Sequence, residues 1–581
     1  MKNFISKAFL LIFLSIIVTN GLYAQNSAKS EKRRGKFFAD GKYAMFIHWG
    51  LYSNLAGKWN GKTHYGISEW LMYPGVANIP ISEYMATAQN FNPVKFNAKE
   101  IAQLAKDAGM KYIIITSKHH DGFAMFHSKA NKFNIVDATP FKRDPMKELA
   151  DACKELGLGF GFYYSHNQDW THPGGSGGPK TDENGNQKTI DNYFLEKCLP
   201  QVEEITKNYG EIELIWFDTP GEMSIERSKQ LVDVVHRNQP HTLVSGRIGY
   251  NLGDYVTYGD MEVPLENVEG LWEGIDVTND SWGYAWYDEN WKTPKQVLIT
   301  LISTIARGGT FMLNIGPDGL GRIPEPAQQT LLASGKWIKQ YPQLVYGAEA
   351  SPWKHSLPWG DIVKQGDKLF LAVFDWPTTG KLYLPGLQTT IISAKILDGS
   401  KSQQLNFEKE GDWVVFNIPY KSPEETISVI ELELSGEPVV NNTMAVDPNI
   451  GITMSSKFSN CFNCTTKQYV WMGKWGEWKH TYRISEWKDN STANWEIMVK
   501  EPGYYQIDVD HLGEDRLVWQ VVTDEGKTIQ NQQPASNLIT KQAIGMIKFD
   551  KAGKHTITVK LLEGNKDKAG LISMSIKPVK F

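Results

Sequence analysis

Short apolar runs alternate with amphipathic segments along the chain up to about residue 345. Six such runs occur, at residues 43–49, 111–117, 158–165, 212–218, 241–246 and 310–316. Between them lie helical patterns such as 97–109, where apolar residues recur at i, i+3, i+4 and i+7 before Gly109. Strands that alternate with helices over about 300 residues predict a parallel sheet, and this length suits a TIM-like (β/α) barrel over residues 36–345. A doubly wound open sheet is the alternative, although no glycine-rich phosphate loop follows the first strand.

The pattern changes after residue 350. Residues 350–437 carry short alternating runs separated by Gly, Pro and charged turns, which is typical of an antiparallel β-sandwich. Residues 434–449 have the composition of a linker, and residues 450–581 repeat the β pattern. We therefore predict an α/β protein in which a TIM-like barrel catalytic domain is followed by two β-sandwich domains. The Trp-rich second sandwich has either a carbohydrate-binding role or a purely structural one.

Length and charge narrow the class of protein. A chain of 581 residues is too long for one ordinary core, so two or three domains are expected. The formal net charge of −4 provides no basic stripe, which argues against a nucleic-acid partner. The 20 Trp and 24 Tyr are suited to stacking on sugar rings, although β modules are rich in aromatic residues in any case.

The first 24 residues have the features of an export signal. Lys2 and Lys7 precede an apolar run over residues 8–18 that is too short to span a bilayer, and Ala24 offers a cleavage site. No later segment has the length and hydrophobicity of a membrane span. We expect a signal peptide over residues 1–24 and a mature protein that is periplasmic or secreted.

The chain has four cysteines, too few for a disulfide scaffold. Cys461 and Cys464 form the one close pair, and no second pair or His cluster completes a zinc site around them. In an exported chain a local disulfide is therefore expected. Cys153 and Cys198 are expected to be buried thiols.

Histidine, tyrosine, tryptophan, aspartate and arginine residues lie at the ends of the predicted barrel strands, where a structural sheet would usually have Gly, Asn or Ser turns. They are His48, His119, His120, Tyr163, Trp216, Asp218 and Arg247. Asp218, after the apolar run 214–217, is either a turn residue or a positioned reactive group. Active sites of (β/α) barrels lie at the carboxyl ends of the strands. Because the other predicted strands also end in such polar and aromatic residues, the second interpretation is favoured. Because no H-E-x-x-H spacing occurs, we expect a site that binds hydroxyl groups, with neither a catalytic metal nor a cofactor.

Several segments, in order, resemble the α-L-fucosidases of glycoside hydrolase family 29. The segments are "FIHWGLYS", "SEWLMYPG", "SKHHDGFAMFHS", "FNIVDATPFKRDP", "GFYYSHNQDW", "LIWFD", "WEGIDVTNDSWGY" and "GGTFMLNIGPDGLGRIP", within residues 36–350. The resemblance implies an irregular (β/α) barrel followed by a β-sandwich. It also implies that fucosylated oligosaccharides or glycoconjugates are hydrolysed with retention through a covalent glycosyl-enzyme intermediate. Neither the oligomeric state nor the fucosyl linkage and aglycone follow from it.

The same resemblance assigns roles to individual residues. It places the nucleophile on Asp218. The residues it implies for binding fucose are His48, Glu69, Trp70, His119, His120, Tyr163, Trp216, Arg247 and Trp282. Their hydrogen-bonding groups suit the hydroxyls of fucose, and the Trp faces suit its C6 methyl group.

The acid/base residue is the least certain assignment, because the loop that carries it varies in length within the family. Counting from Arg247 places Asp260 nearest the family position, so Asp260 ranks first, Glu262 second and Glu273 third. Two alternative functions stay open at this point. One is action on another L-sugar, such as an α-L-galactoside. The other is a non-catalytic lectin, although such a protein would be expected to lack the Asp218 carboxylate.

Overall fold

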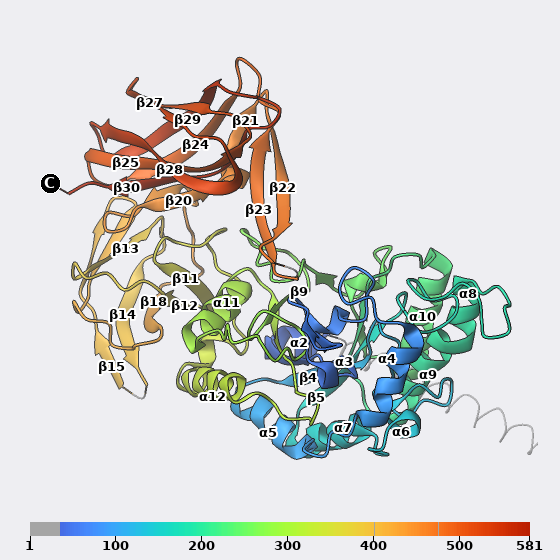
Figure 1. The fold of residues 1–581 in the computed structure, drawn as a ribbon. Helices are drawn as coiled ribbons and strands as arrows, with labels where there is room; N and C mark the ends of the chain where they lie inside the picture. The colour runs from blue at the N-terminus through green and yellow to red at the C-terminus, as the bar shows by residue number, and fades with distance from the viewer. Residues whose placement is uncertain (1–34, 400, 475, 581) are drawn as a thin grey trace, which may run out of the picture. The chain divides into compact units, whose positions relative to one another are not determined.

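The computed structural model describes residues 35–399, 401–474 and 476–580 (Figure 1). These residues form two compact units. The first comprises the chain up to Tyr258, Glu269–Val297 and Gly309–Gly347; the second comprises Gly259–Val268, Leu298–Gly308 and the chain from Ala348 onward. Two short segments within the predicted barrel range, 259–268 and 298–308, therefore belong to the unit that holds the sandwiches. The predicted signal peptide, residues 1–24, lies outside the described residues.

The first unit contains an eight-stranded sheet whose strand pairs are all parallel. Its strands are β1 (Tyr43–Ile47), β4 (Tyr112–Lys118), β5 (Gly159–Ser165), β6 (Leu214–Asp218), β7 (Leu243–Val244), β8 (Val256–Thr257), β9 (Trp272–Val277) and β10 (Thr310–Ile315). Their order in the sheet is β7-β6-β5-β4-β1-β10-β9-β8, and a parallel bridge between Ser245 and Tyr255 links the two end strands. The predicted TIM-like fold is confirmed.

Six of the eight strands coincide with the apolar runs in the sequence, and two do not. Strand β8 has only two residues, too few for any periodicity. Strand β9 has the sequence WEGIDV, and its two acidic residues mask a strand in which all six residues are buried. Glu273 therefore lies inside a barrel strand, whereas the sequence had suggested a loop.

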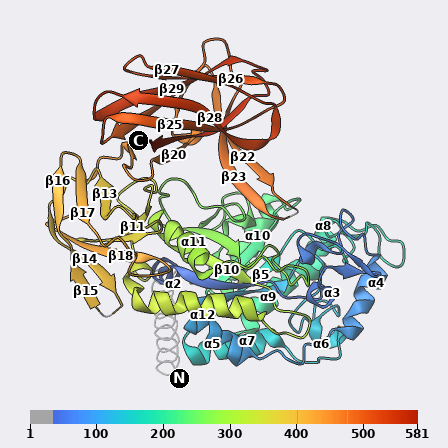
Figure 2. The ribbon, with the colours of Figure 1, turned by 60° about the vertical axis from the view of Figure 1, so that its left-hand side comes forward.

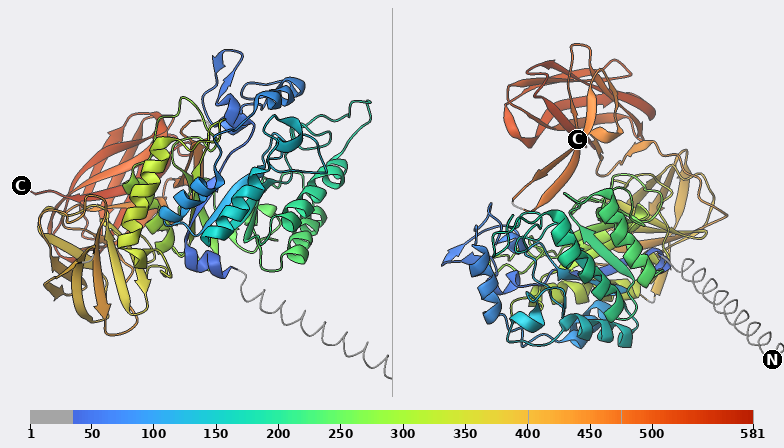
Figure 3. Two further views of the ribbon diagram at one scale, coloured as in Figure 1. Left: turned by 90° about the horizontal axis from the view of Figure 1, so that it is seen from below. Right: turned by 90° about the vertical axis from the view of Figure 1, so that its right-hand side faces the viewer.

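Helices flank the barrel strands, and their ends follow local sequence rules. The longer ones are α5 (Ala98–Asp107), α7 (Pro145–Leu156), α9 (Leu199–Asn208), α10 (Ile225–Asn238) and α12 (Glu325–Gln340); most of a further helix, α11 (Pro294–Ala306), belongs to the second unit. The Asp144 side chain accepts a hydrogen bond from the Lys147 N–H at the start of α7, and Gly157 ends this helix in a left-handed conformation. Figure 3 shows helices of this unit side by side along the outside of the sheet.

The second unit contains two β-sandwiches, as predicted. The sheets of the first are β11 (Gly360–Gln365), β12 (Lys368–Val373), β18 (Ser428–Leu434), β14 (Ile391–Asp398) and β15 (Lys401–Gln404) against β13 (Lys381–Pro385), β17 (Trp413–Asn417) and β16 (Phe407–Glu410). A core that includes Trp353, Trp359 and Phe416 fills this sandwich.

The second sandwich is larger. One sheet holds β19 (Met444–Val446), β24 (Thr492–Val499), β29 (Gly553–Glu563), β26 (Leu517–Thr523) and β27 (Thr528–Gln533), with β21 (Asn460–Phe462) beside β24. The other holds β22 (Thr465–Met472), β23 (Trp478–Ser485), β30 (Gly570–Pro578), β25 (Gly503–Gly513) and β28 (Ser536–Phe549), with β20 (Ile452–Ser455) beside β30. Strand β19 falls within the predicted linker, so this part of the linker prediction is wrong: Met444–Val446 is buried and pairs with β24.

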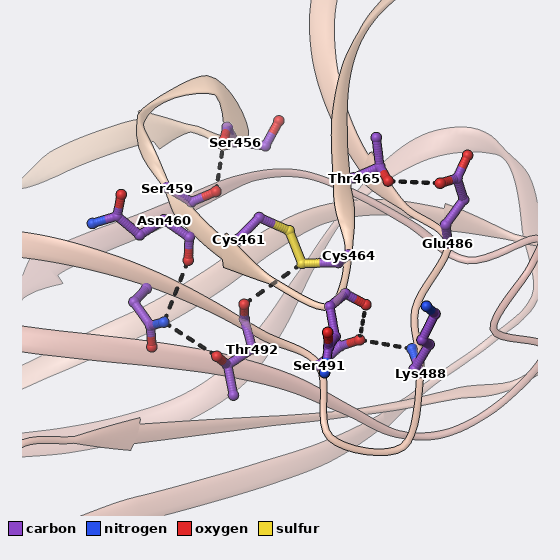
Figure 4. The surroundings of a disulfide bond; sticks show 12 residues. Ser456, Ser459, Asn460, Cys461, Cys464, Thr465, Glu486, Lys488, Ser491 and Thr492 are labelled. Atoms are coloured by element: carbon purple, nitrogen blue, oxygen red, sulfur yellow. Dashed lines mark hydrogen bonds between the residues drawn. A yellow bond between two sulfur atoms is a disulfide. The ribbon is translucent and has the colours of Figure 1, made fainter.

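The cysteines behave as expected. Cys461 and Cys464 form a disulfide that joins the end of β21 to the start of β22 (Figure 4). Cys153 and Cys198 are free and buried. No helix among the described residues has the length and apolar character needed to cross a membrane.

Candidate active site

Asp218 is the last residue of β6, and its carboxylate is held on both oxygens. The Tyr163 hydroxyl donates to Oδ2 over 2.8 Å, and Arg247 Nη1 donates to Oδ1 over 3.2 Å. The Thr219 N–H donates to Oδ1 over 2.9 Å, and Thr219 adopts a left-handed conformation with φ of 50°. A β-branched residue rarely adopts this conformation, so the turn after Asp218 is strained, as is common at functional sites.

The surroundings of Asp218 favour its ionised form. Its side chain is almost fully buried, and burial by itself raises the pKa of a carboxyl group. The positive charge of Arg247, the ring of His120 and the Tyr163 hydroxyl outweigh this effect and hold the pKa of Asp218 below its usual value. A charged carboxylate that is almost fully buried is suited to act as a nucleophile.

Three side chains that flank Asp218 are stacked on one another. The Trp216 ring lies parallel to Tyr163, with 5.5 Å between centroids and 17° between planes. The Arg247 guanidinium lies 4.7 Å from the centre of the Trp216 ring. Trp216 thus contacts both side chains that donate to the carboxylate of Asp218.

Glu273 supports this stack from inside the barrel. Trp216 Nε1 donates to its Oε1 over 2.7 Å, and the Tyr255 hydroxyl donates to its Oε2 over 3.3 Å. The side chain is fully buried, and burial raises the pKa of Glu273 to about 8. An acid/base residue must reach the oxygen of the leaving group, and Glu273 is enclosed with both oxygens engaged. This geometry disfavours the third-ranked acid/base candidate.

Three histidines line the same site. His48 follows β1, and His119 and His120 follow the last residue of β4. The ring centroids of His119 and His120 lie 4.2 Å apart. Placement in the turn after the strand brings both rings to one site, which two successive strand residues could not achieve. His120 Nε2 is 3.6 Å from Asp218 Oδ2.

All three imidazoles are neutral at physiological pH. Burial lowers the pKa of His48 and of His120 to about 4, and it holds the pKa of His119 well below the usual value. A neutral imidazole offers one donor and one acceptor, which suits a sugar hydroxyl. Within the described ranges, no three His, Cys, Asp or Glu side chains are arranged to hold a metal ion.

The remaining predicted sugar-binding residues come from loops that follow the strands. Glu69 and Trp70 lie in the short helix η1 (Ser68–Trp70), and Trp282 follows β9. Glu69 Oε2 accepts the Gly283 N–H over 2.9 Å, which ties η1 to the segment after β9. Trp70 packs edge to face on His120, and Trp282 lies 5.1 Å from the His48 ring. All nine predicted sugar-binding residues therefore belong to the first unit.

Three further residues shape the site and were not predicted. Asn314 on β10 accepts from His48 Nδ1 over 2.7 Å and donates to the Trp282 carbonyl over 2.7 Å. Ser165 Oγ lies 2.7 Å from His120 Nδ1. Trp170 is buried against Trp70 and His120. Asn314 and Ser165 carried a signal in the sequence, since each is a polar residue at or near the end of an apolar strand.

The two leading acid/base candidates lie in a segment of the second unit. Asp260 and Glu262 belong to the turn after Tyr258, the residue at which the chain leaves the first unit. Arg247 Nη2 donates to the Tyr258 carbonyl over 3.1 Å, so Arg247 contacts both Asp218 and the backbone two residues before Asp260. Asp260 and Glu262 are half-buried.

Comparisons with known proteins agree on one family. Residues 12–343 match the alpha-L-fucosidase family. An alpha-L-fucosidase of Dictyostelium discoideum is 27% identical over 461 residues, which cover 72% of this chain and 96% of that protein. The crystal structure of an alpha-L-fucosidase from Vibrio sp. strain EJY3 superposes with a TM-score of 0.77 at 29% identity, covering 93% of this chain and 97% of the other. Alpha-L-fucosidase isoenzyme 1 from Paenibacillus thiaminolyticus gives a TM-score of 0.62 at 31% identity, covering 70% and 100%.

Proposed function

Since the chain belongs to the alpha-L-fucosidase family of glycoside hydrolases, we propose that it removes terminal α-L-fucosyl residues from fucosylated glycans with retention of configuration. The observation that carries this proposal is the ionised Asp218 carboxylate, fixed at a barrel strand end by Tyr163 and Arg247. Because each of its oxygens accepts a hydrogen bond, the carboxylate has a fixed orientation, which favours attack on a correctly placed anomeric carbon.

The reaction proceeds in two steps. Asp218 attacks the anomeric carbon and forms an ester, while the acid/base residue gives its proton to the departing glycosidic oxygen. The same residue then takes a proton from water, the hydroxide attacks the anomeric carbon, and the ester bond to Asp218 breaks. We assign the acid/base role to the segment after Tyr258, with Asp260 ranked before Glu262.

The rings around Asp218 provide the contacts for fucose. His48, His119 and His120 are neutral and offer donors and acceptors to hydroxyl groups. Trp70 and Trp282 provide apolar faces suited to the C6 methyl group. A site of this chemistry holds a terminal sugar and releases it after hydrolysis.

The stereochemistry of the first product tests the proposal. Hydrolysis of an aryl α-L-fucoside followed by proton NMR should show α-L-fucose first, with the β anomer appearing only through mutarotation. Initial formation of β-L-fucose would contradict retention. An aryl α-L-galactoside, which carries a hydroxymethyl group in place of the methyl, is the matched control for sugar specificity.

Export to the periplasm or the exterior is a further part of the proposal. The basic residues and apolar run of the first 24 residues support it, and so does the Cys461–Cys464 disulfide, since disulfides persist in oxidising compartments. Mass spectrometry of the protein from its native host should give an N-terminus at Gln25. An intact N-terminus in the cytoplasmic fraction would contradict export.

A further inference from the structure

Two segments of the first unit lie at the carboxyl ends of neighbouring barrel strands. The β1 segment, residues 48–97, connects β1 to α5, and the β9 segment, residues 278–293, connects β9 to α11. Strand β10 is the one strand between β1 and β9 in the sheet, so the two segments start close together on the face where barrel active sites are built. Figure 2 shows the β1 segment, blue and marked by α3 (Tyr52–Leu55) and α4 (Ile81–Ala86), at the edge of the first unit.

Two buried hydrogen bonds join the segments next to the residues expected to bind fucose. The Ser68 N–H donates to Ser281 Oγ over 3.0 Å. The Gly283 N–H donates to Glu69 Oε2 over 2.9 Å. Glu69, and Trp282 beside Gly283, belong to the predicted sugar-binding set. The joined segments therefore form one continuous surface that begins at the fucose site.

This surface carries a group of aromatic rings that solvent reaches. Tyr65 is 74% exposed and Trp286 is 42% exposed. Tyr287 contacts both, with its ring centroid 4.9 Å from that of Tyr65 and 6.1 Å, edge to face, from that of Trp286. The Tyr287 hydroxyl donates to the Gly66 carbonyl, which fixes this central ring to the β1 segment. We call Tyr65, Trp286 and Tyr287 the aromatic patch.

Local contacts hold the patch at the surface. The Trp286 N–H donates to the Ala56 carbonyl over 3.2 Å, and Lys58 Nζ lies 4.0 Å from the centre of the Trp286 ring. Single exposed apolar residues are common on proteins, whereas a contiguous group beside a binding site marks an interaction surface. The patch therefore calls for a ligand.

A sugar ring is the ligand that fits the patch best. The flat faces of Tyr and Trp suit the apolar face of a pyranose, and the ammonium group of Lys58 offers donors to its hydroxyls. A stable protein partner would need a total interface of about 1,000 Å² or more, which three side chains do not provide. The rest of a fucosylated glycan must leave the fucose site across the adjoining surface, so the substrate itself brings sugar rings to this place.

We propose that the aromatic patch binds the glycan part of the substrate, the sugar rings beyond the fucosyl bond. This role rests on the proposed function and narrows it to oligosaccharides and glycoconjugates in preference to small fucosides. Tyr65 is four residues from Glu69, and Trp286 is four residues from Trp282. At most about 14 Å of extended chain separates each pair, a length that a short oligosaccharide can span.

Kinetics on two kinds of substrate with full-length variants test the inference. α-L-Fucosyl fluoride has no sugar beyond fucose, whereas a panel of fucosylated tetrasaccharides presents further rings to the patch. Tyr65→Ala and Trp286→Ala should each lower kcat/KM about fivefold to tenfold on tetrasaccharides that the wild type hydrolyses, mainly through KM, and by less than about twofold on the fluoride. Tyr65→Phe should behave as wild type, because stacking needs the ring and not the hydroxyl. Tyr420→Ala is the matched control, since Tyr420 is also 74% exposed but lies in the first sandwich.

Three kinetic results would overturn the inference. In the first, Tyr65→Ala and Trp286→Ala match Tyr420→Ala on both kinds of substrate. In the second, they lose the same factor on both, which indicates that the patch supports the fucose site and does not bind the glycan. In the third, the wild type hydrolyses the fluoride and none of the tetrasaccharides. Failure of the wild type to hydrolyse the fluoride as well rejects the proposed function itself.

Calorimetric titration of the Asp218→Asn variant gives a measure of the patch that needs no turnover. The tetrasaccharide should bind more tightly than L-fucose, and adding Tyr65→Ala should remove most of this difference while leaving the affinity for L-fucose unchanged. Equal affinities for the tetrasaccharide with and without Tyr65→Ala would overturn the inference.

Discussion

The nucleophile and the acid/base turn are held in place by different means. Asp218 ends a barrel strand, and its partners Tyr163 and Arg247 come from the next strand and from the segment after β7, within the same unit. Asp260 lies in a turn that accepts hydrogen bonds from residues more than 200 positions later in the chain. The contacts of the nucleophile therefore come from the barrel, whereas the turn is contacted by the hairpin β22–β23 of the second sandwich. The difference predicts that substitutions in the two regions impair different steps of the reaction.

The largest effect is expected at Asp218. Asp218→Asn should fold normally and lower kcat by roughly a thousandfold or more on every substrate, because it removes the covalent step whatever the leaving group. Steady-state kinetics and circular dichroism measure the two outcomes. In Asp218→Gly, azide should restore part of the rate and give a fucosyl azide of inverted configuration. Activity above about a tenth of wild type in any of these variants would contradict the assignment.

The acid/base turn should respond selectively. Asp260→Ala should lower kcat/KM on a poor leaving group by roughly a hundredfold or more and should abolish the basic limb of the pH–rate profile. Glu262→Ala should have a smaller effect on the same substrates, since it removes an anchor of the turn. An activated aryl fucoside is the control, on which both variants stay close to wild type. If Glu262→Ala shows both effects and Asp260→Ala neither, the two roles are exchanged.

Substitution of Glu273 should change the stability of the protein and have little effect on the catalytic reaction. Its pKa in the folded protein is about 8, above that of an unfolded glutamate, so its contribution to stability is complete at low pH and is lost as the pH rises toward 8. Glu273→Gln removes this dependence while keeping an acceptor for Trp216. The free energy of unfolding of the variant relative to wild type should therefore rise between pH 5 and pH 8 by at most a few kcal/mol, and its melting temperature relative to wild type should rise with it. An equal difference at both pH values would show that Glu273 is ionised in the folded protein.

The sequence allowed the barrel site to be predicted because that site is local to the strands. Apolar runs located six strands, and the polar residues at their ends, including Asp218 and His48, marked the site. The same reasoning failed for β9, where Glu273 and Asp276 are buried by neighbours that no local pattern reveals. Asn314 had the same signal as Asp218, a polar residue in an apolar strand, but it lies one residue before the end of its strand.

The acidic turn could not be placed from sequence for a different reason. Three of its contacts join residues far apart in the chain, and neither Gln468 nor His480 belongs to a recognisable motif. The left-handed conformation of Met261 was equally hidden, since methionine gives no signal for a tight turn. Counting along the family pattern could rank Asp260 and Glu262, but it could not show that the hairpin β22–β23 contacts both residues.

The smallest expected effect comes from removing metal ions. In the proposed mechanism two carboxyl groups carry out the chemistry, and the histidines near Asp218 bind hydroxyl groups. His48 Nδ1 is hydrogen-bonded to Asn314, and His120 Nδ1 contacts Ser165, so each ring is oriented by a neutral partner at or near the end of a neighbouring strand. Prolonged dialysis against a chelator should therefore leave the rate on an aryl fucoside unchanged, and His120→Gln should raise KM more than it lowers kcat. Loss of activity that a divalent ion restores would show instead that the histidines hold a metal ion, which would then be a third catalytic group beside Asp218.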